Sequence, residues 1–250
     1  MNLEIKKDLA SNWFKTLQDA FCDDISKLEK NKVVFKSTVW KRNTKKDEGG
    51  GEFRILKNGK IFEKVGVNFS KVYGKFPKQF QKKIPWAQKD PRFWASGISV
   101  VMHMKNPLIP AMHFNTRYIC TTQDWFGGGM DVTPSKIDKT EKKEFHKILK
   151  NMCNRHGKNY YKKYKKWCDE YFYLPHRRES RGIGGIFFDY KKSNYEKDFK
   201  FVRDVGVTFQ LIFNKIIQNK IKKKWTIKDK ENQYIKRGRY TEFNLLYDRG

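Results

Sequence analysis

The sequence predicts an α+β protein in which antiparallel strand pairs are flanked by helices. Three stretches alternate apolar and polar residues and are rich in β-branched and aromatic residues: 33–42, 52–74 and 95–104. Such alternation is typical of strands with one buried face. Helical segments do not alternate regularly with these strands, which disfavours a parallel sheet, because parallel strands need a crossover between them.

The N-terminal half begins with a helix and continues with hairpins. Over residues 3–30, apolar side chains recur at spacings of three, four and one, as in an amphipathic helix. The segment "KNGK" predicts a hairpin turn, because Asn-Gly tolerates positive φ, and "EGGGE" is interpreted as a loop. The prolines of "NPLIP" predict the next connection. A loop centred near Leu108 would place His103 opposite His113.

The C-terminal half is mainly helical. Residues 138–156 and 158–173 are predicted as two helices separated by Gly157. Further predictions are a loop at 175–185, a strand at 186–190, a helix at 195–219 and a strand at 239–250. No internal repeat or linker is visible, so residues 1–250 are interpreted as a single domain.

Composition places limits on the class of protein. Hydrophobic residues make up 38% of the 250 residues, enough for a core. No apolar run approaches the ~20 residues that span a membrane, and "MNLEIKKDLASNW" does not resemble a signal peptide. We therefore expect a soluble cytoplasmic protein. The four cysteines form no C-x-x-C pair, so we expect reduced thiols and no structural zinc site.

The net charge of +28 has two interpretations. Lysines are scattered along the whole chain, which favours compositional drift. The alternative is a polyanionic partner, either a nucleic acid or a small molecule with several carboxylates. A basic nucleic-acid binder with many aromatic residues therefore remains a competing hypothesis.

The stretch "HFNTRY" carries the most informative side chains. If it is a strand, His113, Asn115 and Arg117 share one face, and Phe114, Thr116 and Tyr118 share the other. An imidazole titrates near neutral pH, which makes His113 the best candidate for acid–base chemistry.

Two glycine-rich segments also stand out. The glycines of "RGIGG" leave the backbone free to approach an anion, and three arginines lie nearby: Arg177, Arg178 and Arg181. The same segment is equally consistent with a plain turn before a strand. In "FGGGMD", three glycines precede Asp131, which either faces a pocket or caps a turn. His103, His113, His146 and His176 lie in or beside the distinctive segments, but no ligand spacing fixes a metal site.

Four long motifs carry a family resemblance: "GISVVMHMKNPLIPAMHFNTRY", "WFGGGMDVTP", "YKKWCDEYFYLPHRRESRGIGGIFFD" and "RGRYTEFNLLYDRG". From about residue 30 to residue 250 the chain resembles the oxygen-dependent coproporphyrinogen III oxidases. That resemblance implies a large antiparallel sheet with helices on both sides and a homodimer. It also implies conversion of two propionates of coproporphyrinogen III to vinyl groups, giving protoporphyrinogen IX in haem biosynthesis, with dioxygen as co-substrate and no organic cofactor.

The resemblance also implies roles for individual residues. His113 is expected to be the proton donor, and Asp131 the catalytic aspartate that accepts a pyrrole N–H. The residues expected at the substrate are Ser99, Asn115, Thr116, Arg117, Arg181, Asp248 and Arg249. In bacterial members of the family, histidines matching His103, His113, His146 and His176 are assigned to a divalent metal, so a metal is a further expectation.

Two departures from the family pattern are visible. The chain stops at "YDRG", where family members usually continue, so we expect it to lack their C-terminal tail. An inactive porphyrinogen-binding relative is therefore an alternative. In addition, Tyr190 stands where the family often has a second aspartate.

Overall fold

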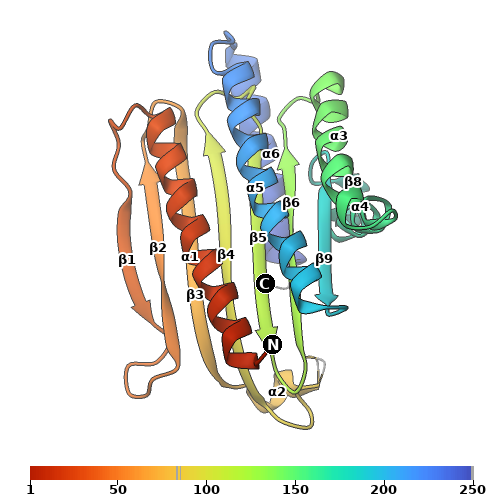
Figure 1. Cartoon of the computed structure of the whole chain (residues 1–250). Coiled ribbons are helices and arrows are strands. Elements are labelled where there is room, and N and C mark those ends of the chain that lie inside the picture. Colours follow the sequence, from red (N-terminus) through yellow and green to blue (C-terminus); the bar gives the residue numbers. More distant parts are fainter. Residues whose placement is uncertain (83, 85, 249–250) are drawn as a thin grey trace.

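A seven-stranded antiparallel sheet forms the centre of the protein in the computed structural model, which describes residues 1–82, 84 and 86–248. The strand order is β1-β2-β3-β4-β5-β6-β9 (Figure 1). The strands are β1 (Lys36–Lys41), β2 (Gly49–Lys57), β3 (Phe62–Lys75), β4 (Arg92–Met104), β5 (Ala111–Cys120), β6 (Asp124–Thr133) and β9 (Gly185–Lys191); β7 (Tyr173–Leu174) and β8 (Glu179–Ser180) form a separate short pair.

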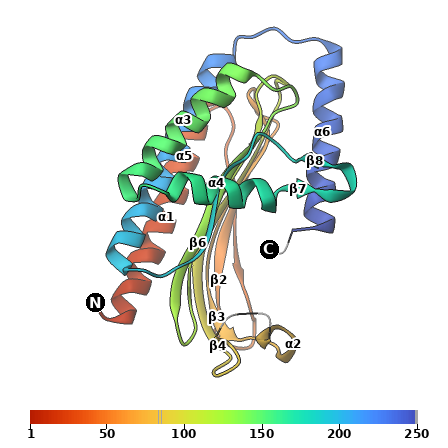
Figure 2. The same cartoon turned by 90° about the vertical axis from the view of Figure 1, so that its right-hand side faces the viewer.

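Helices lie on both sides of the sheet, as expected. Figure 2 shows α1, α3 and α5 on one side and α6 on the other, where part of the sheet is left open. The helices are α1 (Leu3–Leu28), α2 (Lys78–Gln81), α3 (Lys139–His156), α4 (Tyr160–Tyr171), α5 (Tyr195–Lys220) and α6 (Ile227–Leu246), with a 3-10 turn at Pro175–Arg177. The α+β prediction is confirmed.

The main core fills the space between the sheet and the helices α1 and α5. Phe21 of α1 meets Phe114 of β5 edge to face at 5.5 Å, and Phe209 of α5 stacks on Phe114 at 5.0 Å. All three side chains are buried. This packing assigns the even-numbered residues of β5 to the core and leaves the odd-numbered ones on the opposite face.

Two predicted segments have a different structure. The glycines of "EGGGE" begin β2, where they pair with β1 and β3. The predicted strand at 239–250 is wrong: residues up to Leu246 belong to α6, which starts with a capping box at Thr226. Tyr240 and Phe243, three residues apart, are buried, as expected for one face of a helix and not for one face of a strand. Residues 249 and 250 lie outside the described part.

The predicted pairing of His103 with His113 is also wrong. Val101 lies opposite His113, because the pairing of β4 with β5 is centred on Pro107 and not on Leu108, which moves the partner of His113 by two residues. Both histidines remain on the same face of the sheet, but His103 lies diagonal to His113.

The four cysteines are free and buried. Among the residues that the structure describes, no helix combines the length and the apolarity needed to cross a bilayer.

Candidate active site

The open face of the sheet carries the side chains singled out in "HFNTRY". Along β5 the odd-numbered residues are half-buried and the even-numbered ones buried, so His113, Asn115 and Arg117 project together from the open face. Asn115 lies opposite Ser99 of β4. The period-two prediction for this strand is confirmed.

Asp131 lies directly opposite His113 across the β5–β6 pair. Its Oδ1 is 2.8 Å from His113 Nδ1, and Asn115 Nδ2 is 3.3 Å from His113 Nε2. Both ring nitrogens of His113 therefore have a protein partner, one of them a carboxylate. Asp131 belongs to a regular buried strand, β6, and not to the flexible or turn-capping segment considered from the sequence.

Arg181 closes this group from the loop before β9. Its Nη2 donates to both carboxylate oxygens of Asp131, each at 2.7 Å, and the exposed fraction of each side chain is 2%. Its guanidinium lies 3.8 Å from the ring centre of Phe172, 4.5 Å from that of Tyr240 and 4.8 Å from that of Phe243. Such cation–π contacts stabilise a desolvated guanidinium.

The charge state of Asp131 follows from this enclosure. Burial by itself raises the pKa of a carboxyl group, but the charge of Arg181 and the hydrogen bond from His113 outweigh it, so the pKa of Asp131 lies below its ordinary value. An ionised Asp131 accepts a hydrogen bond from His113 Nδ1, which leaves Nε2 to accept from the Asn115 amide.

A second ion pair holds Arg117. Its Nη2 donates to Asp189 Oδ2 at 2.7 Å, while Trp125 Nε1 donates to Asp189 Oδ1 at 3.2 Å. Gly127 makes room for this arrangement, because a Cβ there would lie 2.4 Å from Asp189 Oδ1. Sequence reasoning missed Asp189, although it stands in the quoted "IFFD"; only the pairing of β9 with β6 brings it to Arg117.

The Thr116 side chain does not join the other predicted substrate residues. It is fully buried, on the same face of β5 as Phe114, and its Oγ1 has no hydrogen-bond partner among the described residues. Period two places neighbouring side chains on opposite faces, so Thr116 cannot share a face with Asn115.

The four histidines do not form one site. His146 Nε2 bonds to the Ile183 carbonyl oxygen at 2.9 Å, and His176 bonds to Tyr247 and Glu242, both at 2.8 Å. His103 packs edge-on to Tyr240. Within the described ranges, no three His, Cys, Asp or Glu side chains are arranged to hold a metal ion. The expected histidine set therefore does not fit a metal in this structure.

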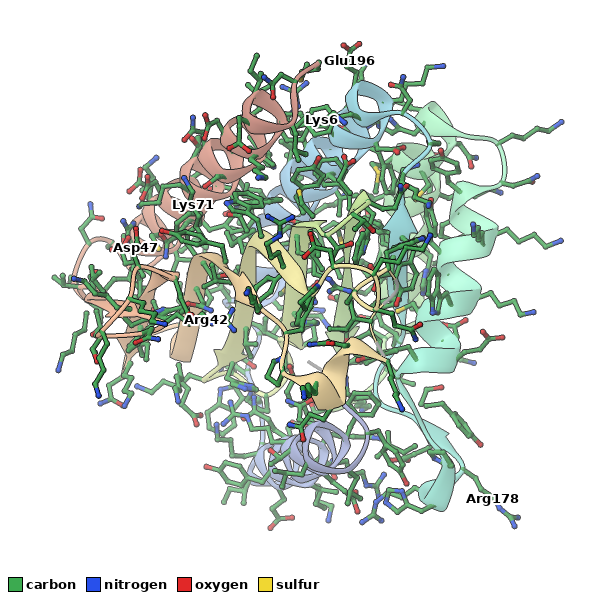
Figure 3. All side chains as sticks on the ribbon, turned by 90° about the horizontal axis from the view of Figure 1, so that it is seen from below. Lys6, Arg42, Asp47, Lys71, Arg178 and Glu196 are labelled. Atoms are coloured by element: carbon green, nitrogen blue, oxygen red, sulfur yellow. The ribbon has the colours of Figure 1, made fainter. Side chains whose placement is uncertain are left out.

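The other predicted anion ligands are dispersed. Arg177 pairs with Glu242, and Arg178 points away from the body of the protein (Figure 3). Asp248 accepts a hydrogen bond from Tyr171 at 2.8 Å, and Arg249 lies outside the described residues. Sequence reasoning also missed Phe172, Tyr240 and Asn244 around Arg181; no local pattern identifies them, because they come from separate elements.

An imidazole hydrogen-bonded to a buried carboxylate and an oriented guanidinium on an open antiparallel sheet are suited to acid–base chemistry and to binding a carboxylate. The family model described as "Coproporphyrinogen III oxidase" matches residues 10–250. The chain belongs to the coproporphyrinogen III oxidase family.

Several curated relatives are similar over nearly the whole chain. The oxygen-dependent coproporphyrinogen-III oxidase of Rickettsia akari (strain Hartford) is 49% identical over 98% of this chain and 89% of its own length. The protein of the same name from Rickettsia rickettsii (strain Sheila Smith) is 49% identical over 100% of this chain and 91% of its own. A third, from Rickettsia bellii (strain RML369-C), is 49% identical over 98% and 89%.

Proposed function

We propose that this protein is an oxygen-dependent coproporphyrinogen III oxidase. In each of two steps, one propionate of the substrate and one dioxygen give a vinyl group, carbon dioxide and hydrogen peroxide. The observation that carries the proposal is His113, supported by Asp131 and aligned with Asn115 and Arg117, in a chain matched to the family over residues 10–250.

His113 is the proton donor in this proposal, and Asp131 is its support. The Asp131 carboxylate accepts a hydrogen bond from His113 Nδ1 and so fixes the orientation of the ring, and Nε2 is the atom that transfers the proton. The family resemblance implies that Asp131 accepts a pyrrole N–H, but here the side chain is buried and its oxygens already accept hydrogen bonds from Arg181 and His113. Asp131 therefore acts through His113.

Substrate binding falls to the remaining polar groups of the open face. Arg117 is partly exposed, and its pairing with Asp189 fixes the direction of the guanidinium. A fixed guanidinium binds a carboxylate with little further loss of side-chain entropy. Asn115 and Ser99 add an amide and a hydroxyl beside it. Such positioning accounts for large rate factors when a substrate is flexible.

We also propose that residues 1–250 act as one domain and that two chains form a homodimer. The support for a dimer is a group of exposed apolar side chains on α6: Ile227, Tyr234, Ile235, Leu245 and Leu246. Exposed apolar patches often mark protein interfaces. Molar mass by light scattering tests the dimer, and a monomer at micromolar concentration would contradict it. Free, buried cysteines support a reducing compartment such as the cytoplasm.

The competing nucleic-acid hypothesis has little support. Most of the largest fully buried side chains are phenylalanines of the core, where they cannot stack on bases.

Turnover is the direct test of the proposed function. The purified chain is supplied with coproporphyrinogen III in the presence and absence of dioxygen, and product is followed as protoporphyrin after oxidation. We expect product with dioxygen only. A folded protein that makes none, while still binding the substrate, would instead be the inactive relative.

A further inference from the structure

The polar row on β5 continues across two more strands. Asn115 lies opposite Ser99 of β4, and Ser99 lies opposite Asn68 of β3. Residues that are directly opposite in a sheet share a face, so all three side chains project from the open face. Asn68 is exposed, and its amide makes no hydrogen bond with the described residues.

A glycine without a neighbouring side chain, Gly66, lies next to this row of polar residues. Gly66, two residues before Asn68 on β3, lies opposite Val101, which itself lies opposite His113. A Cβ built at Gly66 would meet nothing within 4 Å, although the residue is in the middle of a 14-residue strand. Glycine weakens a strand interior and often marks a place where a ligand approaches the backbone.

A cation lies at the other side of Gly66. Lys64 is exposed on the same face and lies opposite His103. Its charge lowers the pKa of His103, although burial of the imidazole is the larger cause. The open space at Gly66 is therefore flanked along β3 by a cationic side chain and by an amide donor.

We propose that Gly66, Asn68 and Ser99, together with Lys64, form a second carboxylate subsite, for a substrate propionate that is not the one reacting at His113. This inference rests on the proposed function. β3 lies two strand spacings, or about 10 Å, from β5. A tetrapyrrole with carboxylates around its rim is wider than one strand spacing, so the β5 side chains cannot bind all of them.

Arg181 and Arg177 do not supply this second subsite. Arg181 is buried against Asp131, and Arg177 is paired with Glu242. Among the described residues, the Asn68 amide and the Ser99 hydroxyl lie beside the β5 row without a hydrogen-bond partner, and the Lys64 ammonium lies on the far side of Gly66. Amide, hydroxyl and ammonium groups all donate hydrogen bonds to carboxylates.

The first test fills the open space with Gly66→Val. The fold should tolerate valine, because nothing occupies the position and valine favours strands. We expect an unchanged or higher Tm. KM should rise roughly tenfold or more, because the valine side chain would keep the substrate carboxylate from its donors and remove about one charged hydrogen-bonding contact. A change mainly in kcat, with KM unaffected, would contradict a binding role.

The second test compares lysines on opposite faces of one strand. Lys64→Gln and Lys71→Gln each remove one positive charge from β3, but Lys71 lies on the side that carries α1 (Figure 3). We expect only Lys64→Gln to raise KM. Asn68→Asp should raise KM further, because it places a carboxylate beside the bound carboxylate.

The outcomes separate this inference from the proposed function. If the wild-type protein turns over and the Gly66, Asn68 and Lys64 variants keep its KM, the subsite is wrong and the function stands. If the wild-type protein makes no product, the Kd for coproporphyrin III, the oxidised macrocycle, replaces KM in the same comparison. If the wild-type protein neither reacts nor binds coproporphyrin III, both proposals are wrong.

Discussion

Nη2 of Arg181 lies 2.7 Å from both carboxylate oxygens of Asp131, inside the protein and beneath α6. The same carboxylate bonds to His113. The positive charge of Arg181, from the loop before β9, and the negative charge of Asp131, from β6, thus neutralise each other next to the candidate proton donor His113. Both the stability of the protein and the chemistry of its site depend on this pair.

Breaking the buried pair should be strongly destabilising. Arg181→Met leaves the Asp131 charge buried without its main partner, and we expect a loss of about 3–5 kcal/mol in the free energy of unfolding. The double variant Arg181→Met with Asp131→Leu removes both charges and should recover part of that loss. Urea unfolding measures both, and additive losses would contradict a direct interaction.

Replacing the candidate proton donor should affect the chemical step. His113→Gln keeps a side-chain amide that can bond to Asp131 but carries no transferable proton near neutral pH. We expect kcat to fall by about 10²–10⁴ with a small change in KM. Steady-state kinetics measure both constants, and the Tm of the variant is the control for folding. A fall in kcat of less than about tenfold would contradict the role of His113.

The pairing of Arg117 with Asp189 should depend on Gly127. In Gly127→Ala the new Cβ would collide with Asp189 Oδ1, so the ion pair must move and the guanidinium of Arg117 loses its fixed direction. We expect KM to rise by roughly tenfold, as for loss of one oriented contact. Asp189→Asn, which keeps the shape but removes the charge, should give a smaller rise; equal KM values for wild type and both variants would contradict the positioning of Arg117.

Thr116→Val tests whether this side chain contacts the substrate. Valine has nearly the same shape, and the Thr116 Oγ1 is buried without a described hydrogen-bond partner. Removing an unsatisfied buried hydroxyl should raise the Tm or leave it unchanged. KM should also be unchanged, because the side chain lies on the core face. A marked increase in KM would show that Thr116 turns to the open face when substrate binds.

His103 should make stability depend on pH. Burial, followed by the charge of Arg237, lowers the pKa of His103 to about 4, so the folded protein resists a proton that the unfolded chain accepts near pH 6.5. Its contribution is fully present above about pH 6.5 and is lost as the pH falls towards 4. His103→Gln should therefore flatten the unfolding free energy between pH 4 and 6.5, by up to roughly 3 kcal/mol; an unchanged slope would contradict a buried neutral imidazole.

Local patterns were sufficient for much of the fold and for part of the site. The spacing of apolar residues predicted α1, α3, α4 and α5, and Asn-Gly predicted the turn between β2 and β3, where Asn58 has a φ of 59°. Period two placed His113, Asn115 and Arg117 on one face without any knowledge of partners. These features depend on neighbours in the chain, which the sequence states directly.

The tertiary structure decided the rest, because it depends on which distant segments pair and in which register. The β5–β6 register sets Asp131 against His113, and chain folding brings in Arg181 from 50 residues away. A shift in the β4–β5 register separates His103 from His113. The last residues of α6, up to Leu246, form a helix because Tyr240 and Phe243 are buried at helical spacing, although the local sequence alternates as a strand would. By itself the sequence determined which side chains project together from a strand; only packing determined what they meet.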